Sequence, residues 1–168
     1  VICSVGDWYV YSVNGETITF VSEITKSGAT IGAINTVVFN PDGSLLVIGG
    51  RFTGYACVYS VSANNNSINV QYLYDLQRNG VALDDDVNCA AFSPDGKTLV
   101  LGGDFEGKAS VYSVNGTSVP YVSDIKRAGL NPSFTSGDVV NAVAFSPDRS
   151  LFVFGGDLTG GVILVILI

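Results

Sequence analysis

The chain repeats itself with a period of 53 residues. A proline turn recurs at this interval, as Asn-Pro-Asp-Gly from residue 40, Ser-Pro-Asp-Gly from 93 and Ser-Pro-Asp-Arg from 146. An asparagine, a phenylalanine and a glycine pair keep the same register around each turn. They are Asn35, Asn88 and Asn141; Phe39, Phe92 and Phe145; and Gly49-Gly50, Gly102-Gly103 and Gly155-Gly156. Such a period indicates an array of similar units, each of which buries its apolar faces against its neighbours.

Each copy of the repeat predicts four short strands. The proline turn joins the first strand to the second, because proline presets φ, aspartate hydrogen-bonds its own backbone and glycine accepts a positive φ. The glycine pair is expected to open a loop to the third strand. Asn-Gly at 14–15 and 115–116 then predicts a tight hairpin to the fourth strand. The first strand is predicted at 34–39, 87–92 and 140–145, and the second at 44–48, 98–101 and 150–154. The third strand is predicted at 10–13, 58–61 and 111–114, and the fourth at 17–24, 68–76 and 119–125.

Four antiparallel strands in a repeat of about 50 residues are typical of a β-propeller blade. The fold class is therefore all-β. The pattern starts in a second strand and stops in a third, which gives about three and a half blades and an incomplete ring. The predicted units are a partial blade at 1–32, blades at 33–85 and 86–138, and a partial blade at 139–168.

Three stretches of the chain resemble the WD40 family of propellers. Residues 140–148 are similar to that family's first strand and turn. Gly102-Gly103-Asp104 with Gly107 resembles its loop between the second and third strands, and residues 111–114 resemble the strand that carries its Trp-Asp pair. Tyrosine and serine stand in place of that pair, and the family's Gly-His pair is absent. The resemblance therefore does not extend to the hydrogen-bonded His/Asp/Ser/Trp network, and another propeller family with the same Ser-Pro-Asp-Gly turn stays an alternative.

The incomplete ring allows three interpretations. The chain is a piece of a longer propeller, or it closes a ring by pairing head to tail with a second copy, or it is an open array. The apolar stretch 162–168 is relevant because an all-apolar strand needs burial on both faces. Exposed edge strands are a liability that proteins normally cover.

Composition excludes several classes of function. The chain has 8 basic and 15 acidic residues, a net charge of −7, which disfavours a nucleic-acid partner. It has no histidine, which excludes Ser-His-Asp and Cys-His catalysis and zinc sites that use histidine. We expect no metal and no cofactor. No signal peptide and no membrane-spanning run is visible, so no compartment is assigned.

Candidate binding residues gather in the loops after the second strands and in the connections between blades. Loops on a rigid scaffold are where binding residues concentrate. The candidates are Arg51, Phe52, Asp84, Asp85, Asp86, Asp104, Phe105, Glu106, Phe134, Asp138 and Asp157. The three consecutive aspartates lack the spacing of a calcium loop and are expected to be a solvated segment.

Three smaller patterns complete the predictions. The three cysteines, Cys3, Cys57 and Cys89, lie in apolar runs without metal-site spacing and are expected to be buried thiols. An acidic residue precedes a basic one by three residues at Glu23, Asp75 and Asp124, which predicts an exposed ion pair in each of these turns. Asn65 and Asn115 begin glycosylation triplets, which have meaning only in a secreted protein.

These observations favour a non-catalytic propeller module that presents a loop face to a protein partner. The acidic character of that face favours basic partner surfaces. The alternative is a structural subunit of an extracellular or surface assembly, in which copies of the chain pair through edge strands. A carboxylate-based hydrolase is less expected, because no pair of carboxylates is marked by a motif.

Overall fold

The computed structural model describes residues 2–3, 8–24, 32–52, 55–64, 67–105, 108–125, 137–158 and 164–167. All regular elements in these ranges are β-strands, and no helix occurs among them. Within these ranges there is accordingly no helix that could span a membrane.

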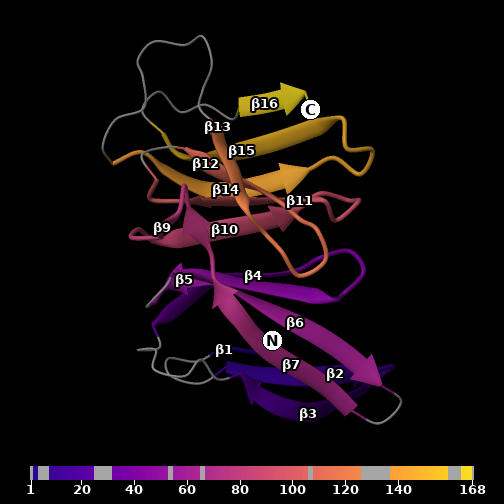
Figure 1. Ribbon diagram of the computed structural model, residues 1–168. Coiled ribbons are helices and arrows are strands. Elements are labelled where there is room, and N and C mark those ends of the chain that lie inside the picture. Colours follow the sequence, from indigo (N-terminus) through magenta and orange to yellow (C-terminus); the bar gives the residue numbers. More distant parts are fainter. Residues whose placement is uncertain are drawn as a thin grey trace.

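Four antiparallel sheets follow one another along the chain and stack face to face (Figure 1). Within each sheet the strands lie side by side in chain order, as expected for propeller blades. The first sheet contains β1 (Ile2–Cys3), β2 (Trp8–Asn14) and β3 (Thr17–Ile24); the second contains β4 (Ala33–Phe39), β5 (Leu45–Arg51), β6 (Ala56–Asn64) and β7 (Ser67–Asp75); the third contains β10 (Val87–Phe92), β11 (Thr98–Gly103), β12 (Ala109–Ser113) and β13 (Tyr121–Ile125); and the fourth contains β14 (Val139–Phe145), β15 (Leu151–Asp157) and β16 (Leu164–Leu167). The predicted all-β, incomplete propeller is confirmed.

A small hairpin that we did not predict lies between the second and third sheets. It consists of β8 (Gln77–Arg78) and β9 (Val81–Ala82). Asn79 and Gly80 form its turn with φ of 52° and 76°. Two successive residues with positive φ are the signature of a tight hairpin turn, and Asn-Gly is the preferred pair. The strands on either side are two residues long, too short to show a strand pattern in the sequence.

We expected the glycine pairs to open loops, and this prediction is wrong. The three pairs lie in the second strand of the second, third and fourth sheets. Opposite each pair, the first strand carries one extra residue, which is Asn35, Asn88 or Asn141. A bulge of this kind bends its strand and increases the local twist. A Cβ atom at Gly50 would lie 2.1 Å from the carbonyl oxygen of Ala33. The bulge therefore requires the second glycine of each pair, which lies within the second strand or, at Gly103, is its last residue.

The first glycine of the pair allows the next sheet to approach in the second and third sheets. A Cβ atom at Gly49 would lie 2.5 Å from Cγ1 of Val87, and one at Gly102 would lie 2.5 Å from Cγ1 of Val140. Both valines belong to the innermost strand of the following sheet. Any side chain at these two glycines would push the neighbouring sheets apart.

Three apolar layers fill the spaces between successive sheets. Trp8 and Tyr59 belong to the first layer, Val58 and Tyr112 to the second, and Phe152 to the third. The two tyrosines are fully buried, and each ring meets the ring of a tyrosine on the adjacent outer strand edge to face. Both tyrosines therefore pack between successive sheets. Cys57 and Cys89 are buried free thiols, as predicted.

The outward face of the first sheet remains open. Tyr11 stands at the same repeat position as Tyr59 and Tyr112, but it is only half-buried. Its ring contacts Phe20, which is 55% exposed, and Val13 and Ile18 beside it are also exposed. In the second and third sheets the equivalent face is covered by the preceding sheet. The first sheet thus carries the same apolar face without a cover among the described residues.

Equivalent tyrosines should therefore differ in their contribution to stability. We expect Tyr59→Ala to lower the free energy of unfolding by about 3–5 kcal/mol, because it leaves a cavity between two sheets. Tyr11→Ala should cost about 1 kcal/mol or less, because water already reaches that ring. Urea denaturation of the two variants measures the difference.

Tyr59→Phe serves as the control for this pair. The buried Tyr59 hydroxyl makes no hydrogen bond with any residue that the structure describes, so its removal should change stability by less than about 1 kcal/mol. Equal losses for the Tyr11 and Tyr59 alanine variants would contradict the open face.

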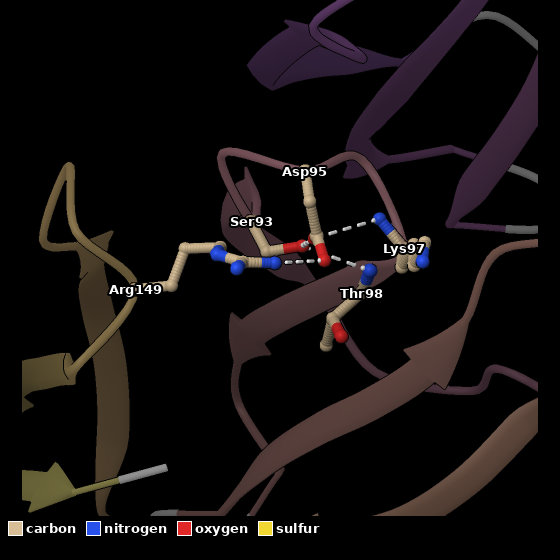
Figure 2. A network of polar contacts seen from close by, with 5 residues as sticks. All are labelled: Ser93, Asp95, Lys97, Thr98 and Arg149. Atoms are coloured by element: carbon tan, nitrogen blue, oxygen red, sulfur yellow. Dashed lines mark hydrogen bonds and ion pairs between the residues drawn. The ribbon is translucent and has the colours of Figure 1, made fainter.

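The proline turns are held by their own side chains (Figure 2). Ser93 Oγ donates to the Asp95 carboxylate at 2.7 Å, and the backbone N–H of Lys97 donates to the same oxygen at 3.1 Å. The N–H of Thr98 donates to Ser93 Oγ at 2.9 Å. The hydrogen bond from the serine, followed by that from the backbone, lowers the pKa of Asp95 to about 2. Asp148 has the same contacts and the same lowered pKa in the next copy.

Arg149 links two of these turns across neighbouring sheets. It occupies the position of Gly43 and Gly96 and keeps their positive φ, at 64°. Its guanidinium donates to Asp95 Oδ2 at 2.6 Å (Figure 2). A non-glycine residue with positive φ is strained by about 1 kcal/mol or more. The exposed ion pair that the side chain gains offsets this cost only in part.

Substitutions at Arg149 should separate strain from pairing. We expect Arg149→Gly to be at least as stable as the parent chain, since relief of strain outweighs the loss of an exposed pair. Arg149→Ala keeps the strain and loses the pair, so it should be about 1–2 kcal/mol less stable than the glycine variant. Thermal or urea unfolding measures both, and an alanine variant equal to the glycine variant would contradict the strain.

The two lowered pKa values predict a pH dependence. Both carboxylates have an unfolded pKa near 3.9, so they stabilise the fold above about pH 4 and lose this contribution as the pH falls toward 2. The double variant Asp95→Asn, Asp148→Asn should therefore show a shallower decline in unfolding free energy between these pH values. Parallel curves for the parent and the variant would show that other groups cause the acid sensitivity.

Candidate partner-binding surface

The blades have two ends with different contents. One end carries the proline turns and the Asn-Gly hairpins, whose residues Asn40–Ser44, Asp95–Lys97 and Val114–Gly116 line a common hollow. The other end carries the loops after the second strands and the connections between sheets. Contacts join these two kinds of segment, since the N–H of Asp104 donates to the carbonyl of Asp86 at 3.0 Å. We call this second end the loop face.

Three of the predicted binding residues lie in the core. Phe52 and Phe105 are 6% and 1% exposed, and Asp138 is 3% exposed. Phe52 packs edge to face on Trp8 at 5.1 Å, and Phe105 lies beneath the guanidinium of Arg78 at 5.5 Å. The two phenylalanine rings belong to the apolar layers between sheets, and all three side chains offer little surface to a partner. The 53-residue period could have predicted this burial. Phe52, Phe105 and Leu158 occupy the same position in successive repeats, and Leu158 is also an apolar residue that is buried.

The remaining candidates divide into described and undescribed residues. Arg51, Asp84, Asp104 and Asp157 are exposed, and Asp85 and Asp86 are half-buried. Arg51, Asp104 and Asp157 share one repeat position, at the ends of successive second strands. Glu106 and Phe134 lie outside the described residues.

Four aspartates form one acidic patch on the loop face. We define the acidic patch as Asp84, Asp85, Asp86 and Asp104. Burial, followed by the nearby charges of Asp84 and Asp104, raises the pKa of Asp85 above its ordinary value. The Arg51 guanidinium lies 3.6 Å from Asp86, but its side chain is 77% exposed, so this pair is weak. The carboxylates therefore keep most of their negative potential.

Three asparagines on the first strands of successive sheets form a ladder of side-chain hydrogen bonds beside the patch. Asn35 Nδ2 donates to Asn88 Oδ1 at 3.1 Å, and Asn88 Nδ2 donates to Asn141 Oδ1 at 3.2 Å. Asn88 also donates to Asp104 at 2.9 Å. The three residues are the bulged ones, which explains why the same residue type recurs at this position. The ladder joins three sheets and holds Asp104 in place.

One of the three ion pairs predicted within turns has both partners among the described residues, and it is not formed; Lys26 and Arg127, the predicted partners of Glu23 and Asp124, lie outside the described residues. Arg78 does not pair with Asp75. Its guanidinium donates to both carboxylate oxygens of Asp124 on β13, at 3.0 and 2.5 Å. Ser110 Oγ donates to the same carboxylate at 3.0 Å. Burial opposes the charge on Asp124, but the bonds from Arg78 and Ser110 outweigh it and lower its pKa.

Asp75 has a similar setting one repeat earlier. Cys57 Sγ and Tyr72 OH lie 3.2 and 3.1 Å from its carboxylate as donors. Cys57 stands at the repeat position of Ser110. The described residues contain no group of three or more His, Cys, Asp or Glu side chains that could hold a metal ion.

Comparison with known proteins identifies the repeat. Residues 81–113 and 130–159 match the family model described as WD domain, G-beta repeat. The chain is 37% identical over 65 residues to the protein named "Probable dipeptidyl-peptidase 5" from Aspergillus clavatus, a match that covers 38% of this chain and 8% of that protein.

Solved structures of propellers match the model over most of its length. Sqt1 from Chaetomium thermophilum is 26% identical with a TM-score of 0.63, and the match covers 88% of this chain and 34% of Sqt1. The periplasmic gluconolactonase PpgL from Pseudomonas aeruginosa is 15% identical with a TM-score of 0.67, covering 96% of this chain and 46% of PpgL, and it shows the fold alone. The chain thus spans between a third and a half of these structures. It consists of WD40-like β-propeller repeats arranged in an incomplete ring.

Proposed function

We propose that the chain is part of a non-catalytic, protein-binding propeller whose loop face holds a basic segment of a partner. The observation that carries this proposal is the acidic patch, whose four aspartates lie near two arginines: Arg51, which is only loosely paired, and Arg78, whose charge Asp124 balances. Rigid elements position all four, because Asp84–Asp86 precede β10 and Asp104 follows β11. A preorganised set of like charges attracts cations without a further cost of ordering.

The Sqt1 structures support a protein partner. One of them is described as Sqt1 bound to the N-terminus of the ribosomal protein L10; this chain is 25% identical to it with a TM-score of 0.61, over 83% of this chain and 33% of Sqt1. By analogy, we propose that the present blades also bind a polypeptide segment. Further copies of the chain, or further blades, are the proposed partners of the open apolar face on the first sheet.

Electrostatic attraction of this kind has a defined signature. Oppositely charged surfaces speed association, and the effect weakens as salt screens the charges. Phosphate backbones carry the same sign as the patch and are repelled, which leaves a basic polypeptide as the complementary ligand.

Neutralising the patch should weaken the binding of a basic peptide. We expect the double variant Asp84→Asn, Asp85→Asn to bind an oligolysine peptide about fivefold to tenfold more weakly at low salt, since each exposed charge pair contributes up to about 1 kcal/mol. The difference should shrink at high salt. Isothermal titration or fluorescence anisotropy gives the dissociation constants.

The matched control is Glu16→Gln, Glu23→Gln, which changes the net charge equally but lies on the exposed part of the first sheet. It should bind nearly as the parent chain does. An equal loss in both double variants would assign the binding to net charge, and no measurable binding by the parent chain would overturn the proposed function.

A further inference from the structure

A groove lies on the outer rim, between the second and third sheets. Its lining residues come from the end of β7, the hairpin β8–β9 and the residues that lead into β13. Figure 1 shows where β7, β9 and β13 lie in the fold. Its volume is about 580 Å³, within the range of protein sites that hold small ligands or single bulky side chains. We call it the rim groove; its principal lining residues are Tyr74, Gln77, Asn79, Val119, Pro120 and Tyr121.

The walls of the rim groove are fixed by hydrogen bonds that cross from one sheet to the next. Tyr74 OH donates to the carbonyl of Thr117 at 2.7 Å and accepts from the N–H of Val119 at 2.9 Å. On the opposite wall, the paired guanidinium of Arg78 anchors the hairpin to Asp124 and lies over Phe105. A groove with fixed walls loses little conformational entropy when a ligand enters.

The lining of the rim groove suits an apolar side chain. The apolar residues of the lining are Tyr74, Tyr121, Pro120 and Val119, of which Val119 is largely buried. The acidic residue in the lining is Asp75, which already accepts hydrogen bonds from Cys57 and Tyr72. Aromatic rings favour bulky apolar groups.

A second hollow leads from the rim groove to the acidic patch. It has a volume of about 320 Å³ and shares Asn79 and Tyr121 with the rim groove. Its lining reaches Asp84, the first residue of the acidic patch, which forms no ion pair with any described residue. The basic residue in this lining is Arg78, whose charge Asp124 balances. An extended basic segment can therefore run from the patch toward the rim groove without meeting an unpaired cation.

We propose that the rim groove holds an aromatic or large aliphatic side chain of the same basic segment that the acidic patch binds. This inference rests on the proposed function. The patch attracts the lysines or arginines of the segment, and the rim groove selects among basic segments by the apolar residue beside them. Burying one such side chain is worth about 1.5–3 kcal/mol, which corresponds to at least tenfold in affinity.

Two pairs of synthetic peptides test the inference. In the first pair, a run of lysines and a Gly-Ser spacer are followed by Phe-Leu in one peptide and by Ser-Ser in the other. The second pair has the same parts in the reverse order, because the bound segment can run in either direction. In one of the two orders, the Phe-Leu peptide should bind the parent chain at least tenfold more tightly than its Ser-Ser partner. The variant Ser118→Trp, which fills the rim groove from an exposed position, should remove this preference.

Thr117→Trp is the matched control, because Thr117 is exposed next to Ser118 but does not line the groove. It should keep the tenfold preference. Equal binding of the two peptides to the parent chain, or an unchanged preference in Ser118→Trp, would overturn the rim groove while leaving the acidic patch intact. The Ser-Ser peptides bind through their lysines alone, so their weaker binding to the double variant Asp84→Asn, Asp85→Asn tests only the acidic patch. The proposed function and the rim groove can therefore fail independently.

Discussion

The close approach of successive sheets at the glycine pairs is the constraint on which the rest of the structure depends. A methyl group at Gly49 or Gly102 would overlap a valine of the following sheet. The second glycine of each pair accommodates a bulge, and the bulged asparagines hydrogen-bond from sheet to sheet. One local feature therefore sets the spacing of the blades and their register, and it fixes the position of Asp104 on the loop face.

Ion pairs supply polar connections beside the apolar layers. The guanidinium of Arg78 is shared between the carboxylate of Asp124 and the ring of Phe105, which come from different parts of the next sheet. Such a pair is half-buried and bidentate, so it is stronger than a surface pair. At the opposite end of the blades, Arg149 and Asp95 make a more exposed link of the same kind. The two links join different neighbours: Arg78 connects the hairpin β8–β9 to the third sheet, and Arg149 connects the fourth sheet to the third.

The sequence predicted the strands because the turn chemistry and the apolar runs recur in one register, so each copy supports the others. It did not predict whether a loop phenylalanine points into the core or toward solvent, and Phe52 and Phe105 are buried in the core. It also predicted the partner of Arg78 wrongly, since local spacing suggested Asp75 while the stacking of sheets brings Asp124 closer. Both errors concern contacts between repeats, which a pattern within one repeat does not contain. The acidic patch was predictable as a set of residues, but the rim groove was not.

The acidic patch and the rim groove adjoin because both depend on the connection between the second and third sheets. This connection contains the hairpin β8–β9 and then Asp84–Asp86, so a single segment of chain forms a wall of the groove and most of the patch. Arg78 anchors the segment at its start, and the strand β10 anchors it at its end. Its geometry is consequently set by the contact between the two sheets. A substitution that separates these sheets, such as a side chain at Gly49, would disturb the patch and the groove together, although it touches neither.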